Sequence, residues 1–205
     1  MATTVTSPKK AQNRAPRSPA IRLTIRDLEL FPEPLDDTRY ELIGGKLHVT
    51  KQPHVAHQRI CLVLGARLET WSAAGGGGSV VPAPGVIFTP EDAVAPDLVW
   101  VSAERAPQVI GEDGKLHAAP DLVIEVLSPG QRNRQRDLEL KLELYARYGV
   151  AEYWVVDWKQ RSVAVHRREG DRLRRTSVLD QASTLESPLL PGFALPLADL
   201  FARLT

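Results

Sequence analysis

The chain has 205 residues, 43% of them hydrophobic and 25% charged, and a formal net charge of +1 at pH 7. This length suits one domain with its own core, and no apolar run approaches the ~18 residues of a membrane-spanning helix. The single cysteine, Cys61, excludes an intramolecular disulfide framework and a thiolate zinc cluster. With no apolar secretory segment at the N-terminus, we expect a cytoplasmic protein that does not enter the membrane.

The first segment, residues 1–20, combines basic residues with Ser, Thr and Pro and has almost no bulky apolar residue. Such a composition predicts a disordered basic tail, and residues 21–205 are then the folded domain. A short helix is expected to begin near Thr24. Next, the strand candidates 39–43 and 46–49 flank two glycines, which is the signal of a β-hairpin.

The middle of the chain alternates between helical and strand patterns. Residues 54–74 carry apolar side chains at helical spacing, and four glycines end this helix. The expected stripe is Ile60, Cys61, Leu64, Leu68 and Trp71. Strand candidates follow at 79–81, 86–88, 97–101 and 121–127.

A second helix is expected over residues 136–148, capped by a glycine at its C-terminal end. Its predicted core stripe is Leu138, Leu142, Tyr145 and Ala146. Strands at 152–157 and 162–166, a turn at 169–171, an Arg-rich strand and a short helix near Leu197 complete the chain. These elements predict an α/β (α+β) fold: a mixed central β-sheet flanked by helices, with an N-terminal and a C-terminal β-hairpin.

Glu125 stands inside the most apolar run of the chain, at residues 121–128. Period-two geometry places it on one face with Val123 and Leu127. A carboxylate among Val and Leu side chains is costly unless it is paired, protonated or bound to a metal. The residue therefore marks a candidate site, with a structural arginine or access to solvent as the alternative explanation.

Asp97 opens the apolar strand candidate 97–101. If this strand pairs with that of Glu125, the two carboxylates can converge on one hard divalent cation. Asp121 stands about 13 Å from Glu125 along the same strand, at roughly 3.3 Å per residue, and is interpreted as a strand-entry residue.

Lys141 lies on the second helix, one turn from Asp137 and one turn from Tyr145. An exposed pair with Asp137 is one interpretation. Because Tyr145 belongs to the predicted core stripe, Lys141 borders the buried side and can point toward the sheet.

Three segments of the sequence carry a family resemblance: Pro120-Asp-Leu-Val-Ile-Glu-Val-Leu-Ser-Pro-Gly130, the Arg/Asp/Lys helix after it, and Tyr145-Ala-Arg-Tyr-Gly-Val-Ala-Glu-Tyr-Trp-Val-Val-Asp157. They resemble the Uma-type family of restriction-endonuclease-like proteins in the PD-(D/E)XK nuclease superfamily. The similarity runs from about Tyr40 to Phe201. It implies a restriction-endonuclease-like fold and a metal-dependent phosphodiesterase centre.

The resemblance assigns roles to individual residues. Asp97 matches the Asp of the motif and Glu125 its (D/E), whereas Leu127 stands where the motif has lysine. Lys141 is similar to the lysine of superfamily variants in which this residue has moved to the following helix. Catalysis is thus expected at Asp97, Glu125 and Lys141, with Mg²⁺ or Mn²⁺ held by Asp97, Glu125 and the Val126 carbonyl.

The resemblance also implies supporting residues. Glu41 is a candidate auxiliary acid, although Gly44-Gly45-Lys46 departs from the usual Asp-Gly-Glu pattern. His57 and Tyr145 are further candidates, with a surface position for the histidine and core packing for the tyrosine as alternatives. Beside two carboxylates, a lysine remains protonated and suits electrostatic stabilisation better than general-base work.

Two groups of basic residues are candidates for contact with a phosphate backbone. The first follows the Glu125 strand: Arg132, Arg134 and Arg136. The second decorates the late hairpin: Lys159, Arg161, Arg167, Arg168, Arg172, Arg174 and Arg175. We favour a nucleic-acid role for the first group and a solvated face for the second.

The leading hypothesis is a Mg²⁺-dependent endonuclease that hydrolyses phosphodiester bonds in DNA, with a homodimer left open. One alternative is a nuclease-fold protein that binds nucleic acid or a protein partner without cutting. A structural or dimerisation module is the other, and it requires a structural arginine at Glu125.

Overall fold

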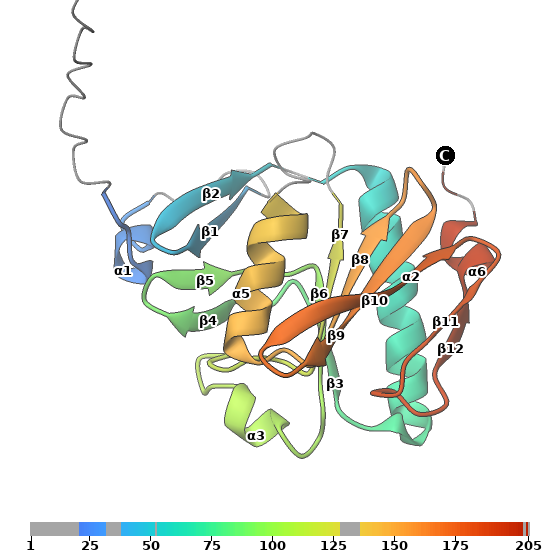
Figure 1. The fold of residues 1–205 in the computed structure, drawn as a ribbon. Helices are drawn as coiled ribbons and strands as arrows, with labels where there is room; N and C mark the ends of the chain where they lie inside the picture. The colour runs from blue at the N-terminus through green and yellow to red at the C-terminus, as the bar shows by residue number, and fades with distance from the viewer. Residues whose placement is uncertain (1–20, 32–37, 52, 128–135, 203, 205) are drawn as a thin grey trace, which may run out of the picture.

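The computed structural model describes residues 21–31, 38–51, 53–127, 136–202 and 204. Figure 1 shows one large sheet with a helix on each face and a smaller sheet packed beside it. Within the described residues, no helix combines the length and apolar character needed to cross a membrane. The predicted tail, residues 1–20, lies outside the described residues.

The large sheet has six strands in the order β10-β9-β8-β7-β6-β3. Only the β7–β8 pairing is parallel, and the other four pairings are antiparallel, so the sheet is mixed as predicted. Its strands are β3 (Ser79–Pro82), β6 (Leu98–Val101), β7 (Leu122–Val126), β8 (Glu152–Asp157), β9 (Ser162–Glu169) and β10 (Arg172–Asp180).

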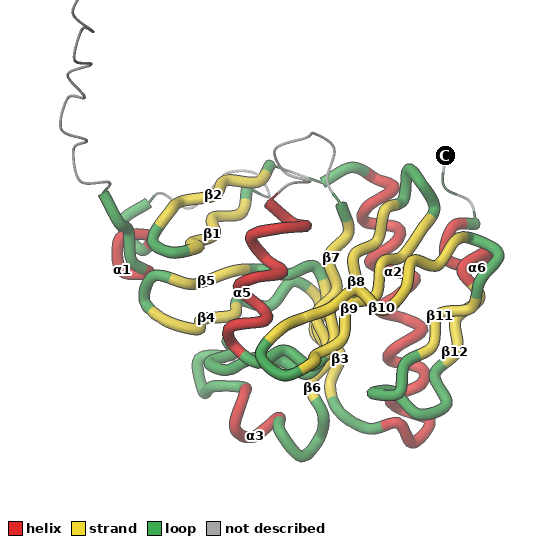
Figure 2. The backbone as a smooth tube through the Cα atoms, viewed as in Figure 1, coloured by secondary structure: helices red, strands yellow, loops and turns green. Residues whose placement is uncertain are grey.

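Two helices cover opposite faces of this sheet (Figure 2). Helix α2 (Val55–Trp71) continues into a π turn, η1 (Ser72–Gly76), and packs with α6 (Leu197–Phe201) on the face that carries Ile124. Helix α5 (Lys141–Tyr148), preceded by the π turn η2 (Arg136–Leu140), packs on the face that carries Val123. Each face of the sheet thus has its own hydrophobic core, and together the two cores bury β7 on both faces.

The smaller sheet has the order β2-β1-β5-β4 and lies next to α5 (Figure 1). Its strands are β1 (Arg39–Ile43), β2 (Lys46–Thr50), β4 (Val86–Thr89) and β5 (Asp92–Val94). The β1–β2 hairpin turns at Gly44 and Gly45, whose φ values of 58° and 71° are the left-handed values that a two-residue hairpin turn requires. The short elements are α1 (Ile25–Leu28), α3 (Ala106–Val109), β11 (Thr184–Glu186) and β12 (Ala194–Pro196).

Most predicted elements are present, and two expectations need correction. The sequence did not predict β5, β11 or β12, which have three residues each and are too short for a periodicity signal. The predicted stripe of the second helix is also rotated: Leu144 and Tyr145 are buried, while Leu138, Leu142 and Ala146 are only partly buried. A π turn adds a residue to the preceding turn and so shifts the phase of the helix.

Two leucines of α2 give a matched test of this packing. Leu64 is completely buried, whereas Leu62 is 68% exposed. We expect Leu64→Ala to lower the free energy of unfolding by about 2–5 kcal/mol, because it removes buried surface and leaves a cavity. Leu62→Ala should change it by about 0.5 kcal/mol or less. Urea denaturation of both variants measures the difference, and equal losses would contradict the orientation of α2.

Candidate active site

The pairing of β6 with β7 brings the two predicted carboxylates together. The register aligns Leu98 with Ile124, so Asp97 lies beside the next residue along β7, Glu125. The Asp97 carboxylate also accepts a hydrogen bond from the Val126 backbone N–H, with an N···O distance of 2.8 Å. Both carboxylates are at least nine-tenths buried, with exposures of 7% and 4%.

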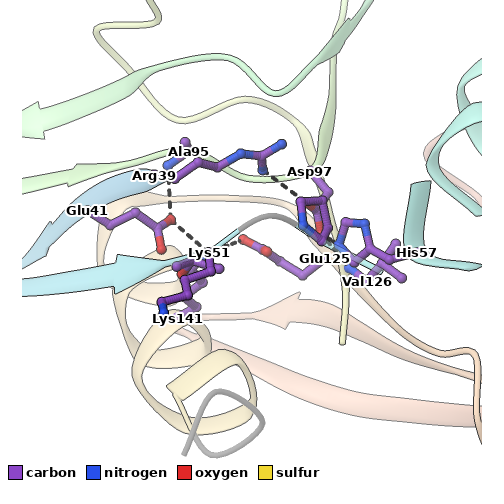
Figure 3. A pocket seen from close by; sticks show the side chains of 11 residues that line it. Arg39, Glu41, Lys51, His57, Ala95, Asp97, Glu125, Val126 and Lys141 are labelled. Carbon is purple, nitrogen blue, oxygen red and sulfur yellow. Dashed lines mark hydrogen bonds and ion pairs between the residues drawn. The ribbon is translucent and has the colours of Figure 1, made fainter. Parts of the chain in front are cut away.

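Glu125 is paired with a lysine and a tyrosine of α5. Its Oε1 atom lies 2.7 Å from Lys141 Nζ and 2.8 Å from the Tyr145 hydroxyl, which donates to it. The same ammonium lies 2.9 Å from Glu41 Oε1 on β1. Figure 3 shows both residues in the pocket. Lys141 is only 2% exposed, and a charge buried this deeply is costly unless it is paired. The two carboxylates of Glu41 and Glu125 provide that pairing.

This network fixes elements that are distant in sequence. Glu41 also accepts a hydrogen bond from the Ala95 backbone N–H at 3.0 Å, which connects the hairpin to the chain entering β6. Burial and the charge of Glu125 raise the pKa of Tyr145 far above its ordinary value. The tyrosine therefore stays a neutral hydrogen-bond donor to Glu125 at physiological pH.

Asp97 is surrounded by three donors. Beyond the Val126 N–H, its Oδ2 lies 3.0 Å from His57 Nε2, and its Oδ1 lies 3.1 Å from Arg39 Nη1. Burial alone would raise the pKa of Asp97, but the hydrogen bond and charge of His57, the Val126 N–H and Lys141 hold it below the usual 3.8. An ionised carboxylate can only accept, so His57 Nε2 carries the proton.

His57 contacts a thiol on its other side, with Cys61 Sγ 3.6 Å from Nδ1. The order Cys61–His57–Asp97 is similar to that of a nucleophilic triad. However, burial, followed by the charge of Asp97, raises the pKa of the Cys61 thiol far above its usual value. A thiol without thiolate character is a poor nucleophile, so covalent catalysis by Cys61 is not supported.

Most of these side chains, but not Tyr145 or Cys61, line one pocket, shown in Figure 3. The open space in it is about 20 Å³, roughly the room for one water molecule or one ion. Three carboxylates and three cationic side chains surround it: Glu41, Asp97 and Glu125, with Arg39, Lys51 and Lys141. Without an added ion the formal charges of these six groups cancel.

The donors in this pocket fit a hard divalent cation. Asp97, Glu125 and Val126 line the same small space, and they offer carboxylate and backbone carbonyl oxygens as donor types. Oxygen ligands of this kind are those that Mg²⁺ and Mn²⁺ bind, usually with several retained waters.

The other sequence candidates have different positions. His57 is buried at 3% exposure, which corrects the expectation of a surface histidine, whereas the neighbouring His54 is exposed and caps α2. Asp121 binds Arg105 and the Ser102 backbone N–H, in agreement with a strand-entry role. Arg132 and Arg134 lie outside the described residues, and Arg136 begins the η2 turn, its side chain also outside the description.

The late basic cluster is largely engaged within the protein. Arg167 pairs with Glu152, Arg174 with Glu169, and Arg168 donates to backbone carbonyls.

Sequence reasoning missed two cations of the pocket, Arg39 and Lys51. Arg39 extends from β1 across the pocket to Asp97 (Figure 3) and keeps 30% of its side chain exposed. Nothing in the local sequence distinguishes it from other hairpin arginines, because its role depends on the pairing of β1 near the start of β6.

The fold and site together define a restriction-endonuclease-like protein. The profile of the Uma2 family, described as "Putative restriction endonuclease", matches residues 26–198. The chain therefore belongs to the Uma2 family, and the resemblance predicted from the sequence is confirmed.

A solved structure agrees with this assignment at the level of the fold. The crystal structure of "a putative nuclease belonging to DUF820" from Anabaena variabilis matches with a TM-score of 0.71 and 22% sequence identity, covering 87% of this chain and 97% of that one. No curated protein matches the chain significantly. Family membership supports a nuclease function.

The lowered pKa of Asp97 has a consequence for stability in acid. A carboxylate whose folded pKa is depressed contributes stability that is present above its unfolded pKa and is lost as pH falls through the folded pKa. We expect Asp97→Asn to be less stable than the wild type at pH 7 by roughly 1–3 kcal/mol. The difference should shrink as the pH drops below about 4.

Urea unfolding at a series of pH values measures this difference. Asp171→Asn, which changes a carboxylate that is 95% exposed, controls for the loss of one negative charge. A stability difference that is independent of pH would contradict the assigned contacts of Asp97.

Proposed function

We propose that the protein is an endonuclease that hydrolyses phosphodiester bonds in DNA with Mg²⁺ or Mn²⁺ as cofactor. One observation carries the proposal: Asp97, Glu125 and the Lys141 ammonium converge on a single ion-sized space. Family membership supports the nuclease class. The divalent ion, the DNA substrate and the residue roles are our inference.

Asp97 and Glu125 would hold the ion, with the Val126 carbonyl as a further oxygen ligand. When bound, such an ion lowers the pKa of a coordinated water and neutralises charge on the scissile phosphate. The six charged groups of the pocket cancel formally, so a divalent ion would leave a charge of about +2 there. That charge attracts a phosphodiester, which the metal-free pocket would not.

Lys141 would act as a fixed cation. Glu41 and Glu125 hold its ammonium from two sides at 2.9 and 2.7 Å, which favours the charged form. A preorganised cation in a buried site stabilises the negative charge that develops on the phosphate oxygens in the transition state. Proton removal from the attacking water is then left to other groups or to solvent.

Arg39 would respond to the substrate. In the structure Arg39 Nη1 lies 3.1 Å from Asp97 Oδ1, and the partly exposed Arg39 side chain lines the pocket. An ion bound to Asp97 competes with this pairing, and an arriving phosphate offers the guanidinium a bidentate partner. We infer that Arg39 moves from Asp97 to the phosphate when ion and DNA bind.

Cleavage of supercoiled plasmid tests the proposal. We expect nicking or linearisation only with added Mg²⁺ or Mn²⁺, and a loss of at least about 100-fold in Asp97→Asn, Glu125→Gln and Lys141→Met, because each removes charge from the centre. Asp121→Asn is the matched control, a buried carboxylate directly before β7 that lies outside the pocket. Circular dichroism confirms that each variant is folded.

Two outcomes would contradict the proposal. Full activity in the three charge variants would place the chemistry elsewhere. Salt-sensitive DNA binding, with no cleavage and with no Mg²⁺ binding detected by calorimetry, would favour a nucleic-acid-binding protein that does not cut.

Arg39→Ala separates ion binding from turnover. We expect Mg²⁺ to bind more tightly, because the competing cation of Asp97 is gone, while cleavage falls by about tenfold or more from the loss of phosphate contact. Calorimetry and single-turnover cleavage measure the two effects. A parallel fall in both would mean that Arg39 only positions Asp97.

A further inference from the structure

A second set of potential metal ligands lies beside the candidate active site. His57 and Cys61 are one turn apart on α2, and Asp97 directly precedes β6. One ligand atom from each residue can be chosen so that all three lie within 4.8 Å of one another. The cluster shares Asp97 with the pocket described above, whereas Cys61 does not line that pocket.

The two contacts of His57 use opposite nitrogens of its ring, so each is compared separately with the spacing around a tetrahedral ion. Zn²⁺ bonds of ~2.0–2.3 Å to N, O and S place neighbouring ligand atoms roughly 3.3–3.6 Å apart. The separations here are 3.0 Å from Asp97 Oδ2 to His57 Nε2 and 3.6 Å from His57 Nδ1 to Cys61 Sγ. Each nitrogen of the His57 ring faces a different neighbour, and one ion can bind only one of these nitrogens. The imidazole or the Cys61 side chain must therefore rotate before all three residues can bind the same ion.

The donor types select a different ion from the oxygen-lined pocket. Thiolate sulfur and imidazole nitrogen bind Zn²⁺ and Cd²⁺ strongly, whereas Mg²⁺ prefers oxygen ligands. Three protein ligands also leave one position of a tetrahedral ion for water.

Charge and access both favour a cation at this cluster. Burial and the charges of Asp97 and Glu125 raise the pKa of the Cys61 thiol, against an opposing effect of Arg39 that is smaller than that of Asp97. The net effect of these charges disfavours a free thiolate and attracts a cation. Cys61 borders a groove of about 630 Å³ between α2 and the β3 and β6 strands, which gives an ion a route that does not cross the candidate active site.

We propose that His57, Cys61 and Asp97 form a site for one thiophilic divalent cation, with Zn²⁺ as the expected ion, and that its binding withdraws Asp97 from the Mg²⁺ site. The first part stands on the cluster alone, and the second rests on the proposed nuclease function. As the metal–sulfur bond forms, the thiol proton leaves to solvent, and the imidazole proton moves from Nε2 to Nδ1 when Nε2 binds. One proton is therefore released per ion bound.

Cobalt substitution tests the site directly. Full-length protein stripped of metal is titrated with Co²⁺, which shows a thiolate-to-metal charge-transfer band in the near ultraviolet when sulfur is a ligand. We expect one Co²⁺ per chain, displacement by Zn²⁺, and loss of the band in Cys61→Ser. Zn²⁺ affinity should fall by at least about tenfold in that variant.

His117→Ala is the control for adventitious binding, because it removes an exposed histidine that pairs with Asp113 far along the chain from the cluster. Its titration should match the wild type. The absence of a charge-transfer band in the wild type, or equal Zn²⁺ affinity in Cys61→Ser, would overturn the proposal. Neither result depends on whether the protein cleaves DNA.

Inhibition tests the coupling between the two sites. Zn²⁺ at low concentration should inhibit Mg²⁺-supported plasmid cleavage in the wild type, and Cys61→Ser should need at least about tenfold more Zn²⁺ while keeping the basal activity. Equal sensitivity of the two proteins would refute the coupling. If the wild type does not cleave, the proposed function fails and the Co²⁺ titration still decides the site.

Discussion

The buried Lys141 ammonium is the constraint on which the candidate site depends. An uncompensated charge at 2% exposure would cost several kcal/mol, so the structure must provide counter-charges at that point. Glu125 from β7 and Glu41 from β1 provide them. The three residues join helix α5, the large sheet and the small sheet, which explains why a hairpin distant in sequence borders the pocket.

The same constraint orients the charged groups of the candidate site. Lysine and carboxylates held this closely are already oriented before any ligand arrives, and preorganised charges need no rearrangement during a reaction. Asp97 is fixed separately by His57, Arg39 and the Val126 N–H, so the two carboxylates of the centre depend on different supports. The pairing of β6 with β7 brings their two backbone positions side by side.

Much of the framework was predictable because period-two and helical patterns are local. The apolar run around Glu125 identified both the central strand and the costly carboxylate within it. Helical spacing placed Lys141 at the border of the buried side, and the family resemblance selected it for the site. Its pairing with Glu125 could not be predicted, since no local pattern connects residues on a strand and a later helix. Arg39 and Lys51 could not be found, because a cation in a hairpin becomes part of a site only through tertiary pairing. The π turn before α5 also altered the helical phase that periodicity assumes.

The central claim is that Asp97 and Glu125 share one divalent ion. Crystals soaked in Mn²⁺ and measured at a wavelength with strong manganese anomalous scattering test this claim most directly. The account predicts one anomalous peak within bonding distance, about 2.0–2.3 Å, of a carboxylate oxygen from each residue, with Lys141 still held beside it. An absence of the peak under saturating Mn²⁺, or a peak that contacts neither carboxylate, would contradict it.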